Sequence, residues 1–279
     1  MNKSITEAPL TTLLCLKIHG SDASTFLQSQ LTIDVDRIEN GQSRMAAYCE
    51  PKGRVISTLV LAFIDGDFYM LIPTVLKDDV LNTLLKYRFR AKVEFDPAAD
   101  SQVYAATVNS TGIIIPHPLD ELRSYRVGSA GHADKSVSTK ELAAWSMADF
   151  DSGMVWLDQR TSCRHLPQSL GLIANNAVDF DKGCYPGQEI IARLKYLGKA
   201  KHTIRKFHTR INSDALAAAN YLRDHSGKRQ GQRLNSISLD SNAHGLAVVS
   251  CAALATDSRL YFADENAQRI GGDIVFDQA

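Results

Sequence analysis

The amino-acid sequence predicts an α+β protein that ends in a small all-β domain, which we interpret as a barrel. Two observations support this prediction. Up to about residue 202, apolar residues alternate in some runs, as in strands, and recur at helical spacing in others. Beyond about residue 203 the helical signal fades and short strand-like runs remain. We therefore expect one region over 1–202 and a second over 203–279.

The first region is expected to begin with a strand and a short helix. The run "TLLCLKI" predicts a strand over 12–18, and Gly20 follows it. A helix is expected to begin near Ser21 or Asp22, because the next apolar residues share one helical face. These residues are Phe26, Leu27 and Leu31.

Three strands joined by two tight turns are predicted next. The turn Glu50-Pro51-Lys52-Gly53 has proline at its second position and glycine at its fourth, which suits a β-turn. Asp65-Gly66 is a dipeptide typical of β-hairpins. The strands are expected over 44–49, 54–64 and 67–72.

Two further helices and several strands complete the prediction. Apolar residues at helical spacing indicate a helix over 74–90, and another is expected over 141–150. Strands are expected between them over 91–95, 102–108 and 124–130. The strand-like runs of the C-terminal region lie over 202–209, 233–239, 244–254, 259–263 and 273–277.

The composition is that of an ordinary globular protein. Hydrophobic residues make up 44% of the 279 residues, charged residues make up 22%, and the formal net charge is +0. The overall charge therefore favours neither nucleic acid nor membrane as a partner. The apolar run Leu13–Leu16 is too short for a signal peptide or a membrane span, so we expect a cytoplasmic protein.

The five cysteines do not indicate a disulfide framework, because they are odd in number, far apart and contain no Cys-x-x-Cys pair. Cys15 and Cys251 lie in apolar strand-like runs, which favours small core residues. Cys163, His165 and Cys184 offer a zinc alternative, but their spacing is poor for a site that needs four ligands. We expect no resident metal.

The stretch "DFDKGCYPGQEIIARLKYLGK", residues 179–199, concentrates reactive and turn-forming residues around one thiol. The alternation at Val178 and Phe180 predicts the end of a strand, and the glycines and proline that follow predict a turn. A helix is expected from Gln188, with Gly198 at its end. Cys184 would then lie within about one turn of a helix N-terminus.

This position favours the thiolate, which is the reactive form of cysteine. Free backbone N–H groups and the helix dipole stabilise negative charge, and Lys182 could add a second positive influence. Glu189 falls in the first helical turn and lies four residues before Arg193, with which it can pair. A structural alternative is that Cys184 only fills a small cavity beside a Gly/Pro loop. The density of polar residues on this loop favours a functional site.

The segment "KGCYPGQE", Lys182 to Glu189, resembles the signature Lys-Gly-Cys-Tyr-x-Gly-Gln-Glu of the YgfZ proteins, which are folate-binding relatives of the glycine-cleavage T-protein. Other segments agree with that family in order. They are "HGSDASTFLQSQLTIDV", "YCEPKGRVISTL", "LPQSLGLIANNAVDFDKGCY", "ARLKYLGKAKHTIRKF" and, more weakly, "HGLAVVS". The similarity covers most of residues 10–210.

The resemblance implies a T-protein-like fold of several subdomains around a central cavity, with two interleaved α+β subdomains over 1–202. It implies binding of tetrahydrofolate or a derivative, support of iron–sulfur enzymes or their assembly factors, and thereby a role in tRNA modification. Cys184 and Lys182 become the expected catalytic residues. The expected folate-binding residues are Asp151, Gly183, Tyr185, Gly187, Gln188, Glu189 and Arg193.

Two departures from the T-proteins matter. An acidic residue before a glycine helps those relatives hold the pterin, and "DFDSGM" offers Asp151, which is shorter than a glutamate. Cys184-Tyr185 replaces the residues that T-proteins carry in the signature, which argues against simple aminomethyl transfer. Both a folate-dependent one-carbon transferase and a redox-active or iron-ligating thiol remain open.

A run of cations follows the signature without any Asp or Glu: Arg193, Lys195, Lys199, Lys201, Arg205, Lys206 and Arg210. Such a run can simply solvate a surface. It can also bind an anion, such as a folate polyglutamate tail or a phosphate backbone. A noncatalytic RNA-binding module is therefore a third hypothesis, although only Tyr196 and Phe207 supply aromatic rings within the run. We expect direct tRNA contact to be less favoured than folate binding, and no membrane partner.

Overall fold

The structure is a computed structural model that describes residues 7–97, 102–106, 110, 112–129, 139–239, 241–256, 258–264 and 266–277. The chain divides into two compact units. The first consists of Met1–Trp145, Trp156–Pro167 and Leu172–Ala192, and the second of Ser146–Val155, Gln168–Gly171 and Arg193–Ala279. The expected boundary after residue 202 stays a prediction.

A five-stranded antiparallel sheet forms the centre of the first unit. Its strand order is β3-β4-β5-β2-β6, with β2 at Leu13–His19, β3 at Gln42–Cys49, β4 at Val55–Ile64, β5 at Asp67–Pro73 and β6 at Glu94–Pro97. Eight of the ten residues of β4 are buried, because this strand lies inside the sheet and carries almost only apolar side chains. The strands predicted over 12–18, 44–49, 54–64 and 67–72 are thus confirmed.

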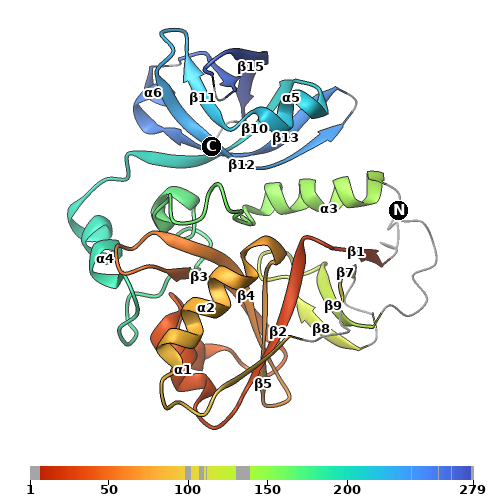
Figure 1. Cartoon of the computed structure of the whole chain (residues 1–279), viewed down its shortest axis with the longest axis vertical. Helices are drawn as coiled ribbons and strands as arrows, with labels where there is room; N and C mark the ends of the chain where they lie inside the picture. The colour runs from red at the N-terminus through yellow and green to blue at the C-terminus, as the bar shows by residue number, and fades with distance from the viewer. Residues whose placement is uncertain are drawn as a thin grey trace. The chain divides into compact units, whose positions relative to one another are not determined.

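Helical segments cover this sheet. They are α1 at Ala23–Gln30, a 3₁₀ turn η1 at Val35–Arg37, a 3₁₀ turn η2 at Thr74–Leu76 and α2 at Lys77–Arg88. Helix α1 buries Phe26 and Leu27, and α2 packs on the sheet at β4 through Val80 and Leu84 (Figure 1). The helix expected over 74–90 is therefore confirmed, and its first turn, η2, is a 3₁₀ turn.

A second antiparallel sheet of the first unit has the order β1-β7-β9-β8. Its strands are β1 at Ala8–Pro9, β7 at Gln102–Ala106, β8 at Ile113–Pro116 and β9 at Ser124–Gly128. Helix α3 at Thr139–Ser152 and the 3₁₀ turn η3 at Pro167–Leu170 follow, and α4 at Gln188–Leu197 comes after the signature. Both α3 and α4 run from one unit into the other.

The C-terminal strands close into a six-stranded barrel, as predicted, in the order β10-β13-β12-β11-β14-β15. They are β10 at His202–Arg210, β11 at Tyr221–Asp224, β12 at Arg229–Leu239, β13 at Asn242–Ser250, β14 at Leu260–Ala263 and β15 at Arg269–Phe276, with short helices α5 at Ser213–Ala218 and α6 at Cys251–Ala255. Phe207 and Phe262 meet edge to face in its core, with ring centroids 5.1 Å apart.

The prediction for the two core cysteines is half right. Cys15 is buried in β2. Cys251 is only half-buried and begins α6 instead of continuing a strand, and its thiol donates to the Ala200 carbonyl oxygen at 3.4 Å. The alanine-rich sequence after Ser250 suits a helix better than a strand, because alanine has the highest helix propensity.

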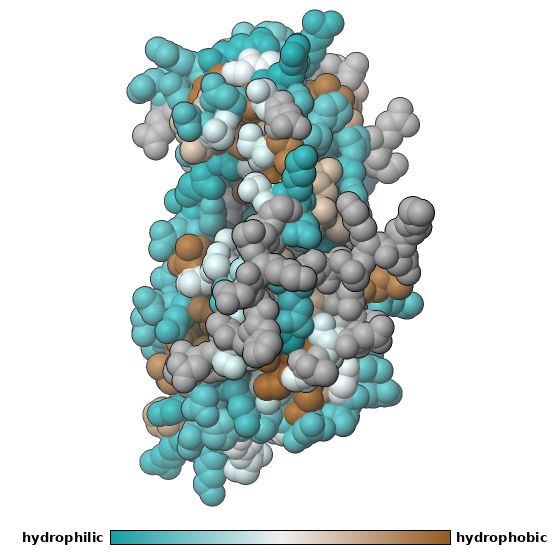
Figure 2. All heavy atoms as spheres, turned by 90° about the vertical axis from the view of Figure 1, so that its right-hand side faces the viewer, coloured by the Kyte–Doolittle hydropathy of each residue, from teal (hydrophilic) through white to brown (hydrophobic). Residues whose placement is uncertain are grey.

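Figure 2 shows a mostly hydrophilic face on which hydrophobic residues form small separate groups. Among the described residues, every helix falls short of the length and apolar character that a membrane crossing needs.

Candidate functional site

The signature forms an exposed loop in the first unit. Cys184 is exposed, and it precedes the first residue of α4 by four positions. Val178 and Phe180 do not lie in a strand, so that prediction is wrong. The segment before the loop is held by side chains and by single backbone bonds instead of a strand ladder.

Lys182 points away from solvent and holds the loop against the end of α1. Its ammonium donates three hydrogen bonds to backbone carbonyl oxygens: Gln28 at 2.7 Å, Leu31 at 2.8 Å and Ile33 at 2.6 Å. The last carbonyls of a helix lack intrahelical donors, and a cation there also interacts favourably with the negative end of the helix dipole. Burial lowers the pKa of Lys182 to about 8, although the Asp34 and Asp179 carboxylates favour the charged form. Lys182 is therefore mainly an ammonium at neutral pH, with three N–H groups to donate.

Asp179 anchors the same segment to β3 and η1. It accepts two hydrogen bonds from the Arg44 guanidinium, at 2.7 and 3.3 Å, and one from the backbone N–H of Asp34 at 2.6 Å. Burial disfavours its charge, but these hydrogen bonds outweigh burial and hold the pKa of Asp179 below its usual range. The carboxylate thus stays ionised and keeps Arg44 in place.

Thr32 joins three segments at a buried point. Its hydroxyl donates to the Ala177 carbonyl oxygen at 2.6 Å and accepts from the Ala47 N–H at 2.9 Å. Its own carbonyl oxygen accepts from the Asp179 N–H at 2.8 Å. The approach to the signature is therefore fixed to β3 and to the segment after α1 by bonds between residues more than a hundred positions apart.

The two signature glycines have different structural roles. Gly187 has φ +82°, and a Cβ there would lie 2.5 Å from the Gly53 Cα and 2.7 Å from the Glu50 carbonyl oxygen. The signature can therefore pack on the β3–β4 turn only with glycine at this position. A Cβ at Gly183, by contrast, would meet no atom within 4 Å. Packing does not explain the glycine next to Cys184.

Tyr185 points inward. Its side chain is 6% exposed, and the Lys182 ammonium lies 5.3 Å from its ring centroid. Burial raises the pKa of its hydroxyl, and that hydroxyl is buried without a hydrogen-bond partner among the described residues. Tyr185 was expected to bind folate; here it packs beneath the loop that presents Cys184.

Helix α4 begins at Gln188 and is followed by Gly198, whose N–H donates to the Leu194 carbonyl oxygen at 3.2 Å, as predicted. Gln188 is half-buried, whereas Glu189 and Arg193 are exposed. No ion pair joins Glu189 to Arg193. Their predicted pairing is therefore not formed in this structure.

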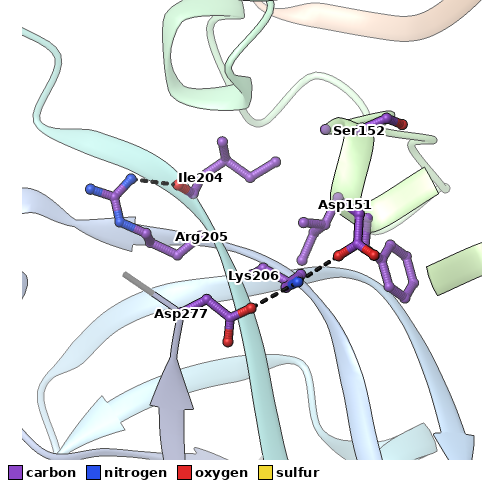
Figure 3. A pocket seen from close by; sticks show the side chains of 9 residues that line it. Asp151, Ser152, Ile204, Arg205, Lys206 and Asp277 are labelled. Atoms are coloured by element: carbon purple, nitrogen blue, oxygen red, sulfur yellow. Dashed lines mark hydrogen bonds and ion pairs between the residues drawn. The ribbon is translucent and has the colours of Figure 1, made fainter. Parts of the chain in front are cut away.

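Asp151 lines a cavity of about 360 Å³ that lies wholly within the second unit. Lys206 lies between two carboxylates there, 2.5 Å from an Asp151 oxygen and 2.8 Å from an Asp277 oxygen (Figure 3). Hydrogen bonds to the two carboxylates raise the pKa of Lys206, and Lys206 in turn lowers the pKa of Asp277. Phe150, Ile204 and Leu246 add apolar walls to the cavity.

The structure distributes the predicted site residues over both units. The signature loop belongs to the first unit, whereas Asp151 and Arg193 belong to the second. Cys163, His165 and Cys184 do not form a ligand group, so the zinc alternative fails. The cationic run is also divided, because Lys206 is paired inside the cavity while Lys195 is exposed.

Sequence reasoning missed several residues of these sites: Thr32, Arg44, Asp179, Lys206 as a cavity residue, and Asp277. Asp179 stands in the signature stretch itself, so its carboxylate was visible, but its partner Arg44 lies 135 positions away. Nothing local connects the two. Lys206 appeared only as one cation of a run.

Replacing Lys182 with methionine is expected to lower the free energy of unfolding by about 2–3 kcal/mol, because three carbonyl oxygens lose a charged donor. Denaturant unfolding measures this change, and limited proteolysis should show faster cleavage near residues 179–187. The matched control is Lys199→Met at an exposed position, with an expected change within about 0.5 kcal/mol. Equal effects of the two substitutions would contradict the anchoring role.

The comparisons with known proteins agree with the resemblance noted in the sequence. No protein-family model matches the chain. An uncharacterized protein of Haemophilus influenzae is 32% identical over 211 residues, which covers 74% of each chain. The tRNA-modifying protein YgfZ of Colwellia psychrerythraea is 28% identical over 235 residues, covering 72% of each chain, and that of Yersinia pestis is 25% identical over 280 residues, covering 88% of this chain and 84% of the relative.

A solved structure has the same fold. The glycine cleavage system aminomethyltransferase T of Bartonella henselae matches with a TM-score of 0.71 over 98% of this chain and 86% of that chain. The two sequences are 13% identical, so the likeness concerns the fold. The expected T-protein-like α+β fold with a C-terminal barrel is confirmed.

Proposed function

Because the chain belongs to the YgfZ family, we propose that it binds tetrahydrofolate or a derivative and supports the assembly or repair of iron–sulfur enzymes that modify tRNA. In this proposal Cys184 acts as a redox-active or transiently iron-ligating thiol. The iron–sulfur protein is its client, and the folate is its cofactor. The relatives named tRNA-modifying protein support the tRNA context.

The observation that carries the proposal is the exposure of Cys184 on a loop that is otherwise firmly held. Lys182 and Asp179 fix the residues before the thiol, and Gly187 packs the residues after it on the β3–β4 turn. A thiol needs access to react or to bind iron, and a held loop reduces the entropy lost when a partner docks. Packing alone would not require an exposed cysteine between two such anchors.

The cavity around Asp151 supports folate binding. Its volume of about 360 Å³ lies in the range of about 300–1,000 Å³ that small-molecule sites occupy. A pterin ring presents neighbouring N–H donors, and the Asp151 oxygen that does not face Lys206 can accept one. The second oxygen of Asp277 lies 3.7 Å from the His208 Nδ1. Lys206 lowers the pKa of Asp277, and Phe150 and Leu246 offer apolar surface to the ring. Arg205 also lines the cavity, and its guanidinium is suited to a folate carboxylate.

Asp151→Asn is expected to weaken tetrahydrofolate binding by about tenfold, because a charged acceptor becomes a neutral amide. Isothermal titration with tetrahydrofolate under anaerobic conditions measures the effect. Asp214→Asn, on exposed α5 of the same unit, is the matched control and should bind as the unchanged protein does. If Asp151→Asn retained full affinity, the pterin would have to bind elsewhere.

Two assays together test the proposed function. The activity of an iron–sulfur tRNA-modifying enzyme is followed with and without this protein, beside tetrahydrofolate titrations of variants at Lys182, Cys184 and Glu189. The proposal expects support of the client without net consumption of folate. Turnover of folate with a one-carbon donor would instead indicate the transferase alternative, and lack of any folate affinity would reject the cofactor.

A further inference from the structure

The end of α2 carries an aromatic-basic patch that the proposed thiol and folate sites do not use. We define the patch by six residues within seven positions: Lys86, Tyr87, Arg88, Phe89, Arg90 and Lys92. All six are exposed, and all belong to the first unit. Helix α2 packs on the core through Val80 and Leu84, and among the patch residues Tyr87 is about half covered.

The patch exposes two aromatic side chains, and Phe89 is the more open of them. Phe89 is 87% exposed and Tyr87 is 48% exposed. Phe89 also occupies a position that suits glycine. The Ala91 N–H donates to the Arg88 carbonyl oxygen at 2.8 Å, which closes a β-turn with Phe89 as its first central residue. Its φ of 45° and ψ of −104° resemble those of a type II′ turn, where glycine dominates.

Neither packing nor backbone preference explains this phenylalanine. A bulky residue at positive φ is strained, and strain that persists without a packing benefit is a sign of function. The Arg90 guanidinium lies 5.7 Å from the Phe89 ring centroid, so a cation and a ring face solvent together.

The four cations of the patch are available to a partner. No ion pair involves Lys86, Arg88, Arg90 or Lys92 within the described ranges, and the sequence has no Asp or Glu from residue 80 to residue 93. Two acids near the patch have partners of their own. Asp22 accepts the Lys92 backbone N–H at 2.7 Å, and Glu94 lies 3.9 Å from a ring nitrogen of His19. The helix dipole accounts for cations at Lys86 and Arg88, but not for Arg90, Lys92 or the exposed rings.

We propose that the aromatic-basic patch binds RNA with unpaired bases, whose phosphates contact the cations and whose bases stack on Phe89 and Tyr87. Interleaved cations and aromatic rings are the surface that single-stranded or looped RNA recognises, because phosphates need positive charge and every base has a face that stacks. The inference deepens the proposed function and rests on it only for the tRNA context. It places RNA contact at the end of α2 instead of in the cationic run after the signature.

The test uses fluorescence anisotropy of two labelled probes, an RNA hairpin with an unpaired loop and a fully paired RNA duplex. Phe89→Gly removes the ring and relieves the backbone strain, so this variant should unfold at the same or a higher temperature. It should nevertheless bind the hairpin about tenfold more weakly and the duplex almost unchanged. Leu122→Ala, at a side chain that is 79% exposed, is the matched apolar control and should bind both probes normally.

A second variant tests the phosphate contacts. Arg90→Gln should reduce the slope of log affinity against log salt for the hairpin by about 0.7, the value expected for one contact to a single strand. Lys140→Gln, an exposed cation on α3, should leave the slope unchanged. Unchanged hairpin binding by Phe89→Gly would overturn the proposal, as would binding to phosphatidylserine vesicles without RNA binding. Tetrahydrofolate titration of the unchanged protein separates the outcomes, because lack of folate affinity would reject the proposed function and leave the RNA result standing.

Discussion

Cys184→Ser is expected to reduce the support of an iron–sulfur tRNA-modifying enzyme to the level seen without the protein. Serine keeps the size and hydrogen-bonding capacity of the side chain, but its hydroxyl does not ionise near neutral pH and is a poor ligand for iron. Tetrahydrofolate affinity should stay unchanged, since Cys184 does not line the cavity around Asp151. The measurements are client activity, folate titration and thermal unfolding of the same preparation.

The exposure of Cys184 makes this a clean test. An exposed side chain on a loop contributes little to stability, so the unfolding temperature should shift by no more than about 1–2 °C. Cys251→Ser is the matched control, because its hydroxyl can still donate to the Ala200 carbonyl oxygen. Full client activity of Cys184→Ser would reject the thiol role while leaving folate binding open.

Gly187→Ala is expected to destabilise the protein by about 3 kcal/mol or more. A side chain at φ +82° is strained, and the added Cβ would come within 2.5 Å of the Gly53 Cα. The β3–β4 turn therefore has to move away from the start of α4. Denaturant unfolding measures the loss, and client activity should fall with it because the residues after Cys184 lose their support.

Gly183→Ala is the matched control on the same loop. Its Cβ would meet no atom within 4 Å, so stability should change by less than about 1 kcal/mol. If Gly183→Ala nevertheless lowered client activity, close approach of a partner to this part of the backbone would be the reason. Equal stabilities of the Gly187→Ala and Gly183→Ala proteins would contradict the packing described for Gly187.

Much of the fold could be predicted because its patterns are local. The strands of the meander are mostly apolar runs between turn residues, and the dipeptide Asp65-Gly66 specifies its own hairpin turn. The helix from Gln188 has its apolar spacing and its terminal Gly198 within a dozen residues. The predicted strand at Val178 and Phe180 was wrong because alternation alone cannot supply the neighbouring strand that a ladder needs.

The candidate sites were harder to predict, because their partners are remote in the sequence. Lys182 was taken for an activator of the thiol, yet its ammonium is bonded to carbonyl oxygens of residues 28–33. Asp151 was expected to bind folate together with signature residues, and the structure pairs it with Lys206, which it shares with Asp277. The exposure of Phe89 is likewise visible only in the folded chain, since a phenylalanine in a helical pattern is usually a core residue.

The sequence by itself determined the α+β class of the fold, the all-β character of its C-terminal region and the helix after the signature. These follow from spacings of a few residues, over which side-chain direction depends on helix or strand geometry alone. Only the tertiary structure decided which groups neutralise one another and which remain open to a ligand, since that depends on atoms brought together from opposite ends of the chain. Arg44 with Asp179, and Asp151 with Lys206, became pairs only on folding.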